Sequence, residues 1–255
     1  MPVAFAIAAH PDDIEFFMAG TMMMLKDAGY TLHYMNVADG CCGTTEFDVD
    51  TIARLRLEEA RAAADYLGAV FHPPICPDLE IFYDRPTLLK LSSVMREVAP
   101  DILLTHSPSD YMEDHMNTCR LAVTAAFARC MPNFPVQPPR DAVLNKVTVY
   151  HAQPYSHRDP LRRIVEPDFF VDVTSVVDRK VQMLGKHATQ KTWLDQSQGQ
   201  DSYLQTLREL DEECGRMSGL FEYAEGWRRH LHLGFCGEKD DPLCDALKGR
   251  VLQAR

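Results

Sequence analysis

Short apolar runs alternate along this chain with longer stretches in which apolar residues recur at helical spacing. The apolar runs predict strands at residues 3–9, 32–38, 69–72, 101–105, 146–152 and 168–173. The amphipathic stretches predict helices at residues 14–29, 51–67, 86–98, 116–130, 176–193 and 202–217. Residues after 226 follow neither pattern clearly. Strands that alternate with helices are typical of a parallel sheet covered on both faces.

The order of these elements predicts an α/β, Rossmann-like fold with a mostly parallel sheet and a C-terminal helical extension. We expect an α/β domain over residues 1–195 and a helical extension over 196–255, packed on the same domain or on a neighbouring subunit. In the common strand order 3-2-1-4-5, the first and fourth strands are neighbours, and ligands bind beyond their carboxyl ends.

Polar side chains follow the first and the fourth predicted strands. His10, Asp12 and Asp13 come directly after the first strand, and a second polar segment, residues 106–115, follows the fourth. The expected strand order brings these two segments into one crevice. Adjacent carboxylates in an apolar context repel each other unless a cation or a proton offsets the repulsion. Since histidine and aspartate are zinc ligands, the sequence predicts a metal site there.

We interpret His10, Asp13 and His115 as the ligands of a catalytic zinc ion. Three protein ligands leave one position for water, and zinc lowers the pKa of that water. Asp12 remains beside the metal as a general base for attack on a carbonyl group. The structural alternative is a turn in which an aspartate caps the following helix. The second polar segment favours the metal.

Several motifs resemble those of the PIG-L / LmbE-like family of zinc-dependent N-deacetylases, which act mostly on N-acetylglucosaminyl compounds. They are AHPDD at residues 9–13, an RxxEAxxAAxxLG pattern that begins at Arg56, the segment Cys76-Pro77-Asp78, and the pair Asp114-His115. The resemblance covers roughly residues 3 to 190 and implies the same metal ligands and the same base. It also implies that Arg56 and Asp78 contact a sugar, with a solvated helix face as the alternative for Arg56. Asp114 would contact one of the metal ligands and orient it without binding the metal itself, and His106 would point into the crevice.

The chain departs from the family at Met112, where the family's HPDH motif has its first histidine. That histidine is expected to stabilise the oxyanion or to act as an acid, and a methionine cannot donate a hydrogen bond. Candidate replacements, including groups from a neighbouring subunit, are His106, Tyr111, His187, and His230 or His232. A catalytically weak or inactive metal- or sugar-binding protein therefore stays open. A metal-free, Rossmann-like binding module is disfavoured because the chain has no GxGxxG motif.

Composition narrows the partners of this chain. Lys and Arg number 26 against 37 Asp and Glu, a net charge of −11, which disfavours nucleic acid. No apolar run approaches the roughly 18 residues of a membrane span. The eight cysteines form no CxxC pair, so we expect reduced thiols in a cytoplasmic protein. The partner that the family resemblance implies is a small, sugar-like N-acyl substrate. Apolar residues in the tail predict a homo-oligomer, and they are Trp227, Leu231, Leu233 and Phe235.

Overall fold

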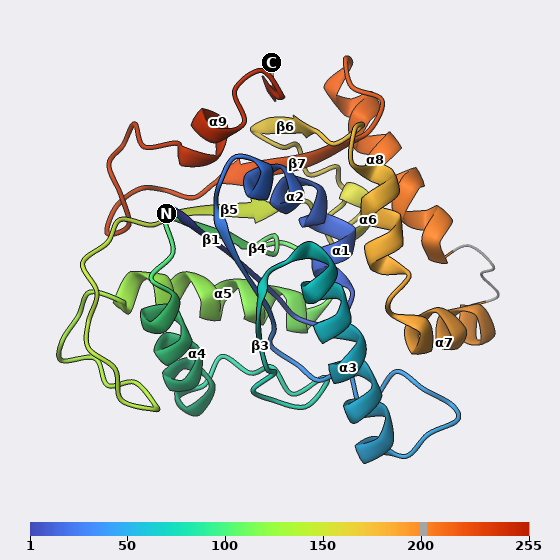
Figure 1. Ribbon diagram of the computed structural model, residues 1–255, viewed down its shortest axis with the longest axis horizontal. Coiled ribbons are helices and arrows are strands. Elements are labelled where there is room, and N and C mark those ends of the chain that lie inside the picture. Colours follow the sequence, from blue (N-terminus) through green and yellow to red (C-terminus); the bar gives the residue numbers. More distant parts are fainter. Residues whose placement is uncertain (199–202, 255) are drawn as a thin grey trace.

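A mixed sheet of eight strands forms the centre of the protein (Figure 1). The computed structural model describes residues 1–198 and 203–254. The strands are β1 (Val3–Ala8), β2 (Thr31–Asn36), β3 (Val70–His72), β4 (Ile102–Thr105), β5 (Thr148–Ala152), β6 (Phe169–Asp172), β7 (Ala224–Arg229) and β8 (Val251–Gln253). Their order is β3-β2-β1-β4-β5-β7-β6-β8. The strands from β3 to β5 in this order are parallel to one another, whereas the pairs β5–β7, β7–β6 and β6–β8 are antiparallel. The predicted order 3-2-1-4-5 is therefore confirmed.

Helices cover both faces of this sheet. They are α1 (Asp13–Phe17), α2 (Ala19–Asp27), α3 (Val49–Leu67), α4 (Arg85–Val98), α5 (Glu113–Ala128), α6 (Val177–Leu184), α7 (Ala188–Gln198), α8 (Tyr203–Ser218) and α9 (Pro242–Ala246), with a short 3-10 helix at Tyr155–His157. Within the described residues, none of these helices has the length and the apolar character that a membrane crossing needs.

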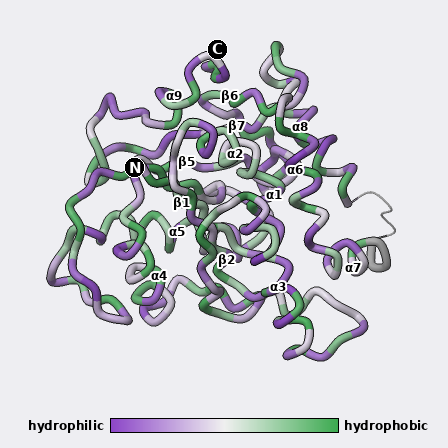
Figure 2. The backbone as a smooth tube through the Cα atoms, in the orientation of Figure 1, coloured by the Kyte–Doolittle hydropathy of each residue, from purple (hydrophilic) through white to green (hydrophobic). Residues whose placement is uncertain are grey.

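The two faces of β1 lie in separate hydrophobic cores, as the alternation of side chains along a strand requires. Ala4, Ala6 and Ala8 belong to the core shared with α1, α2, α3, α6 and α8. Phe5 and Ile7 belong to the core shared with α4 and α5. Hydrophobic positions accordingly concentrate on the central strands (Figure 2). A strand buried on both faces holds its carboxyl end, where the polar turn begins, in a fixed position.

The helix predicted over residues 14–29 is two helices, and this prediction was wrong at Met18. Met18 has φ −138° and ψ −20°, which ends α1 and lets α2 start in a new direction. The backbone N–H groups of Gly20 and Thr21 donate hydrogen bonds to Glu225, each at 2.8 Å. A carboxylate at a helix N-terminus is favourable, since it accepts hydrogen bonds from otherwise unpaired amides. The break thus turns the first amides of α2 towards a residue 205 positions away in the chain.

The helix predicted over residues 176–193 is also interrupted, at residues 185–187, which separate α6 from α7. The predicted helix over 202–217 corresponds to α8, and its first residue, Ser202, lies outside the described residues.

The C-terminal region contains strands as well as the expected helices. β7 lies between β5 and β6, and β8 extends the edge of the same sheet beyond β6. Sequence analysis found neither strand. The division into residues 1–195 and 196–255 stays a prediction, but the second segment completes the sheet of the first.

Two apolar residues that we expected on a subunit-facing surface are buried within the chain. Trp227, on β7, is fully buried in the core, and its indole N–H donates to Thr21 Oγ1 at 2.9 Å. Phe235 is buried beside Phe127. Leu231 and Leu233 are each 63% exposed, as expected. The homo-oligomer stays a prediction, supported by two of the four residues that suggested it.

Candidate metal centre and active-site cavity

The turn between β1 and α1 is held by hydrogen bonds to two neighbouring strands. Ala9 N–H donates to His106 Nε2 at 2.9 Å, and Asn36, at the end of β2, donates to the carbonyl oxygen of His10 at 2.6 Å. Asp12 has φ 108°, in the left-handed region that a residue with a Cβ rarely adopts. Such strain persists where the surrounding structure enforces it, and it occurs often at functional sites.

Three buried side chains from the two polar segments converge beyond β1 and β4. His10 Nδ1 lies 3.4 Å from Asp13 Oδ2, and His115 Nε2 lies 3.3 Å from Asp13 Oδ1. One potential ligand atom from each of these residues lies within 4.8 Å of the other two. Two imidazole nitrogens and a carboxylate oxygen this close fit a divalent metal ion such as zinc, whose bonds to these atoms are about 2.0–2.2 Å long.

A carboxylate holds the other nitrogen of each histidine. His10 Nε2 lies 3.0 Å from Asp114 Oδ2, which also accepts a hydrogen bond from Leu79 N–H at 3.0 Å. His115 Nδ1 lies 3.0 Å from Asp110 Oδ1. Metal-binding histidines commonly donate their second ring N–H to such a carboxylate, which fixes the tautomer and the orientation of the ring. Both histidines thus present their remaining nitrogen towards Asp13.

The helix that carries His115 begins earlier than the predicted residue 116. α5 starts at Glu113, so Asp114 and His115 both lie in its first turn.

His106 lies behind the three clustered residues. Its ring stacks on that of His115, with a centroid distance of 4.1 Å and an interplanar angle of 10°. Because its Nε2 accepts the hydrogen bond from Ala9, a neutral His106 carries its proton on Nδ1. Burial, with His115 nearby, lowers the pKa of His106, which favours this neutral form. His106 therefore supports His115, and it does not line the cavity described next.

The clustered residues form part of the wall of a cavity of about 490 Å³. Besides them, the described lining residues are Asp12, Phe16, Phe17, Cys42, Gly43, Arg56, Asp78, Leu79, Tyr111, Met112, Tyr155, Gln190, Trp193, Leu194, Tyr203 and Thr206. The lining of the cavity combines aromatic and apolar side chains with a smaller number of charged and polar ones, as is typical of small-molecule sites.

Asp12 faces this cavity beside the three clustered residues. Tyr203, on α8, donates a hydrogen bond to Asp12 Oδ2 at 2.7 Å. Burial and the nearby charge of Asp13 raise the pKa of Asp12 to about 6, although His187, Tyr203 and Arg56 act in the opposite direction. A carboxylate with a pKa close to neutral is well matched to accepting and returning a proton.

The two residues expected to contact a sugar also line the cavity. Arg56 is only 2% exposed, so its interpretation as a solvated helix face was wrong. Its Nη2 donates to the carbonyl oxygen of Gly43 at 3.1 Å. Asp78 Oδ1 lies 3.2 Å from His10 Nε2, and Asp78 Oδ2 accepts a hydrogen bond from Cys42 N–H at 3.2 Å. Asp78 therefore lies between the loop at Cys42 and the metal cluster.

Of the candidates to replace the missing motif histidine, Tyr111 lines the cavity together with Met112. The described structure places the four histidines elsewhere. His187 is buried, with Nε2 3.3 Å from Glu15 Oε1, and His230 Nδ1 lies 2.9 Å from His151 Nε2. His106 lies behind His115, and His232 lies outside the cavity wall.

Sequence reasoning missed Asp110 and Tyr203. Asp110 stands in the polar segment 106–115 and is fully buried, so its position five residues before His115 was an available signal. Tyr203 reaches Asp12 from 191 residues away and belongs to no motif.

Comparison with known proteins gives a family model and several relatives. The model described as PIG-L: GlcNAc-PI de-N-acetylase matches residues 5–127. A diacetylchitobiose deacetylase of Thermococcus kodakarensis is 30% identical over 238 residues, which cover 87% of this chain and 80% of that protein. A 4-oxalmesaconate hydratase of Pseudomonas putida is 30% identical over 185 residues, which cover 69% of each protein.

Solved structures give the same two kinds of neighbour. The 4-carboxy-2-hydroxymuconate hydratase of Pseudomonas putida superposes with a TM-score of 0.72 at 25% identity, covering 90% of this chain and 96% of that chain. The N,N'-diacetylchitobiose deacetylase of Pyrococcus horikoshii superposes with a TM-score of 0.74 at 23% identity, covering 91% of this chain and 84% of that chain. The second likeness bears on the fold alone.

Proposed function

We propose that this chain, which belongs to the PIG-L family of de-N-acetylases, is a zinc-dependent hydrolase of small N-acyl compounds. It would remove an acyl group, in the first place acetyl, from an N-acylated sugar or a related small amide. The observation that carries the proposal is the convergence of His10, Asp13 and His115 on one side of a cavity that Asp12 also lines.

The residues around the cluster have separate tasks in this proposal. Zinc held by two histidines and an aspartate supplies Lewis acidity, which polarises a carbonyl group and makes water more acidic. Asp12 accepts the proton of the attacking water and passes it to the leaving nitrogen. Tyr203 orients Asp12 through their 2.7 Å hydrogen bond. Amide hydrolysis then yields a carboxylate and an amine.

Tyr111 is the donor that we propose in place of the missing motif histidine. It lines the cavity next to Met112, and its ring lies 5.7 Å from the ring of His115 at an interplanar angle of 80°. A phenol can donate a hydrogen bond to an oxygen on which negative charge develops, whereas methionine cannot.

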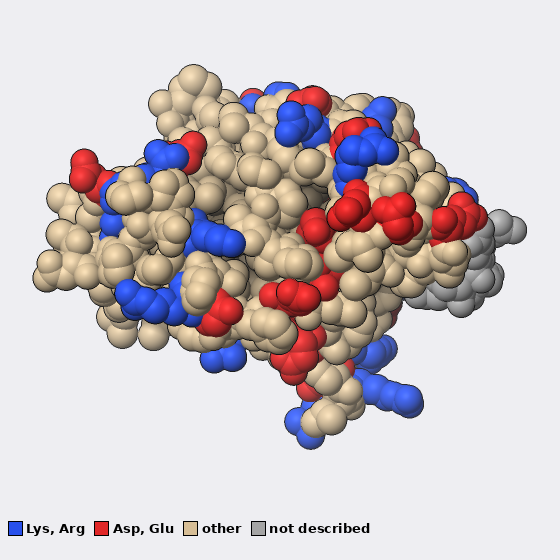
Figure 3. Space-filling view, turned by 90° about the horizontal axis from the view of Figure 1, so that it is seen from below, with Lys and Arg blue, Asp and Glu red and all other residues tan. Residues whose placement is uncertain are grey.

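The charges of the cavity support an uncharged substrate. Among the described lining residues, Arg56 is the single Lys or Arg, against the carboxylates of Asp12, Asp13 and Asp78. A divalent ion and Arg56 together balance these three carboxylates, which leaves no positive charge for an anion. Asp and Glu side chains also form a band across the face of the molecule seen in Figure 3. Hydroxyl groups suit this lining, because Arg56 can donate hydrogen bonds to them and Asp78 can accept.

Acetate release from N-acetylglucosamine and diacetylchitobiose tests the proposal, with added zinc and with a chelator. We expect release that the chelator abolishes and zinc restores. Asp12→Asn should keep stoichiometric metal and lose activity by about 10²–10⁴-fold, the usual contribution of a general base. Release that survives complete metal removal would refute the zinc mechanism. Metal binding without turnover of any N-acyl sugar would favour the alternative of a metal- or sugar-binding protein.

Hydration of an unsaturated carboxylic acid is a second candidate function. The likeness to the 4-oxalmesaconate hydratase favours it, as does Met112, since adding water across a carbon–carbon double bond needs no leaving amine. The shortage of cations in the cavity argues against such a polyanionic substrate. Incubation with 4-oxalmesaconate, followed by the loss of its conjugated absorbance, distinguishes the two functions.

A further inference from the structure

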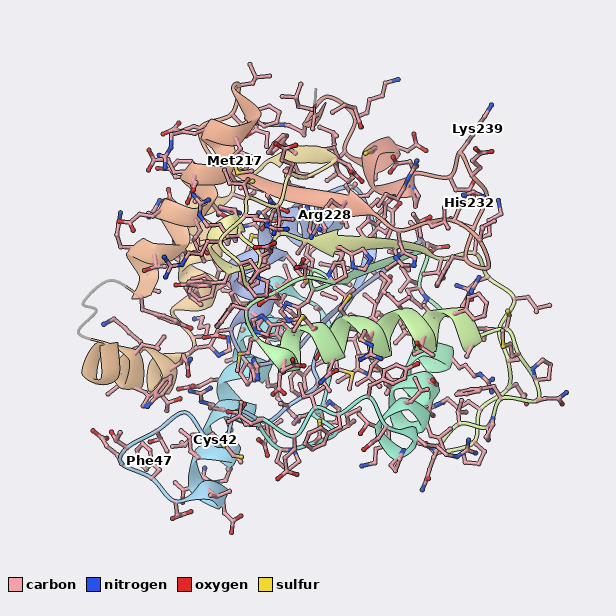
Figure 4. The ribbon with its side chains drawn as sticks, turned by 180° about the vertical axis from the view of Figure 1, so that it is seen from behind. Cys42, Phe47, Met217, Arg228, His232 and Lys239 are labelled. Atoms are coloured by element: carbon pink, nitrogen blue, oxygen red, sulfur yellow. The ribbon has the colours of Figure 1, made fainter. Side chains whose placement is uncertain are left out.

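A second cavity lies against the active-site cavity, on the other side of Trp193. This outer cavity has a volume of about 180 Å³, and its described lining residues are Thr44, Thr45, Glu46, Phe47, Ala188, Thr189, Thr192 and Trp193. Trp193 lines both cavities, and Gly43 of the inner one is followed in the chain by Thr44 of the outer one. Figures 1 and 4 show the loop that carries Cys42 and Phe47 beside α7. The two cavities therefore adjoin each other along one loop and one helix.

We propose that the outer cavity is a substrate subsite for an uncharged ring, carried by the substrate beyond its N-acylated sugar. The inference rests on the proposed function, because the inner cavity then holds the reacting amide. It adds that the preferred substrate is larger than a monosaccharide, and that the part furthest from the metal bears no negative charge.

Aromatic side chains give the outer cavity its affinity for a ring. Trp193 is half-buried between the cavities, and Phe47 is 44% exposed at its outer side. Aromatic faces bind flat apolar surfaces well, and the two rings line the same cavity. Ala188 and the methyl groups of the four threonines complete a lining that is mostly apolar.

The charges of the lining exclude an anionic group. Glu46 contributes a carboxylate, and none of the described lining residues of the outer cavity is Lys or Arg. A carboxylate or phosphate bound there would lose water without gaining a cation, which is unfavourable. The anionic headgroup of a phosphoinositide therefore does not fit this subsite, although the family model carries the name of such a substrate.

The helix that builds the subsite is anchored at its first turn. Thr189 donates two hydrogen bonds to Glu59 of α3, from its backbone N–H at 2.9 Å and from its hydroxyl at 2.7 Å. Glu59 lies one turn after Arg56, which lines the inner cavity. Because the same helix holds both Arg56 and the start of α7, the distance between the sugar site and the ring subsite is fixed.

The test compares kcat/KM of the zinc-loaded enzyme for four N-acetylglucosamine compounds: the free sugar, its phenyl glycoside, its p-carboxyphenyl glycoside and diacetylchitobiose. We expect the phenyl glycoside, the disaccharide or both to exceed the free sugar by about tenfold, which corresponds to one stacked ring. Which of these two compounds gains identifies the ring as aryl or sugar. The p-carboxyphenyl glycoside should lose the gain. Equal kcat/KM for all uncharged compounds would overturn the subsite.

Phe47→Ser and a matched control locate the effect. Phe47→Ser should lower the ratio of kcat/KM between the ring-bearing compound and the free sugar towards one. Phe82→Ser removes a phenylalanine that is 56% exposed and lines neither cavity, so it should leave that ratio unchanged. A ratio that persists in Phe47→Ser would contradict the assignment.

Binding of the amine products separates this proposal from the proposed function, because it needs no turnover. The chain has two tryptophans, and Trp227 is fully buried against Thr21, so a ligand in the cavities changes the fluorescence of Trp193. Phenyl glucosaminide should change the emission at a concentration about tenfold lower than glucosamine does, and Trp193→Phe should remove the signal. Tighter binding of the ring-bearing amine without turnover of any N-acetyl compound would support the subsite and refute the proposed deacetylase activity. Turnover with no preference for a ring would support the deacetylase activity and refute the subsite.

Discussion

Two clusters of buried charge in this protein satisfy their charges in different ways. In the ion-pair cluster (Lys180, Asp211 and Glu225), Lys180 Nζ lies 2.7 Å from Asp211 Oδ1 and 2.8 Å from Glu225 Oε1. The two oxygens of Glu225 also accept the N–H groups of Gly20 and Thr21. In the metal cluster (His10, Asp13 and His115), carboxylates hold the outer nitrogens of the histidines, and the inner atoms face one another beside a cavity.

The difference shows that buried charge alone does not mark a functional site. The ion-pair cluster connects α6, α8, β7 and the start of α2, and it lines none of the described cavities. Its charges have partners within the chain, which is what a structural role needs. In the metal cluster the inner nitrogen of His10 and that of His115 each face the Asp13 carboxylate, so a proton or a metal ion must lie between them. Breaking either cluster should therefore damage a different property.

The largest effect should follow Asp13→Ala, which removes the central ligand of the metal cluster. We expect loss of bound metal and a fall in activity of about a thousandfold or more, because Lewis acidity contributes several kcal/mol to such reactions. The fold should persist. Metal analysis and circular dichroism check this result, with the exposed Asp178→Ala as the control. Stoichiometric zinc in Asp13→Ala would show that the ligand set is wrong.

Lys180→Met should have the opposite profile. It leaves two buried carboxylates without their ammonium partner, and we expect a loss of about 3–5 kcal/mol in the free energy of unfolding. Metal content and the activity of the folded fraction should not change. Urea denaturation measures the loss, and Lys239→Met removes an exposed lysine as the control. A metal-free but stable Lys180→Met protein would mean that the two clusters are coupled.

Asp110→Asn tests whether the carboxylate that contacts His115 supports metal binding, and its expected effect is smaller. An asparagine amide can donate a hydrogen bond to His115 Nδ1, which would shift the ring proton to Nε2, the nitrogen that faces Asp13. We expect metal affinity to fall by about 10–100-fold, as is usual when such a partner is changed. Competition with a chromophoric chelator measures this affinity. An unchanged value would show that Asp110 has no part in orienting His115.

The same contrast explains what could be predicted from the sequence. The convergence of His10, Asp13 and His115 was predictable because they lie in the segments that follow β1 and β4, and parallel strands bring those segments together. The parallel half of the sheet was predictable because its strands are apolar runs, buried on both faces. Both kinds of information are local.

The antiparallel half depends on partners that are distant in the sequence. The sequence of β7 is AEGWRR, whose charged residues do not form the apolar run that predicts a buried strand. Its Glu225 is nevertheless only 3% exposed. Glu225 can be buried there because it pairs with Lys180 and accepts hydrogen bonds from the first amides of α2. The local sequence pattern does not predict those contacts. Tyr203 and the α7 wall of the cavity were missed for the same reason.

The last effect that we expect is a pH dependence of the free energy of unfolding to which the ion-pair cluster contributes. Burial raises the pKa of Asp211 from 3.8 to about 7, and Glu225 adds to the shift, although Lys180 opposes it. Between these two pH values the folded state holds a proton that the unfolded state has released, so stability falls as pH rises from about 4 to about 7. The slope is at most about 1.4 kcal/mol per pH unit, and it ends above pH 7.

Asp211→Asn should flatten this part of the stability profile, since an amide keeps its hydrogen-bonding capacity without titrating. Urea denaturation of the metal-free protein from pH 5 to pH 8 compares the two chains, with Asp178→Asn as the exposed control. Identical slopes for the wild type and Asp211→Asn would show that Asp211 stays ionised against Lys180 over the whole range. The ion-pair cluster would then be fully charged, and the contrast with the metal cluster would rest on the availability of partners alone.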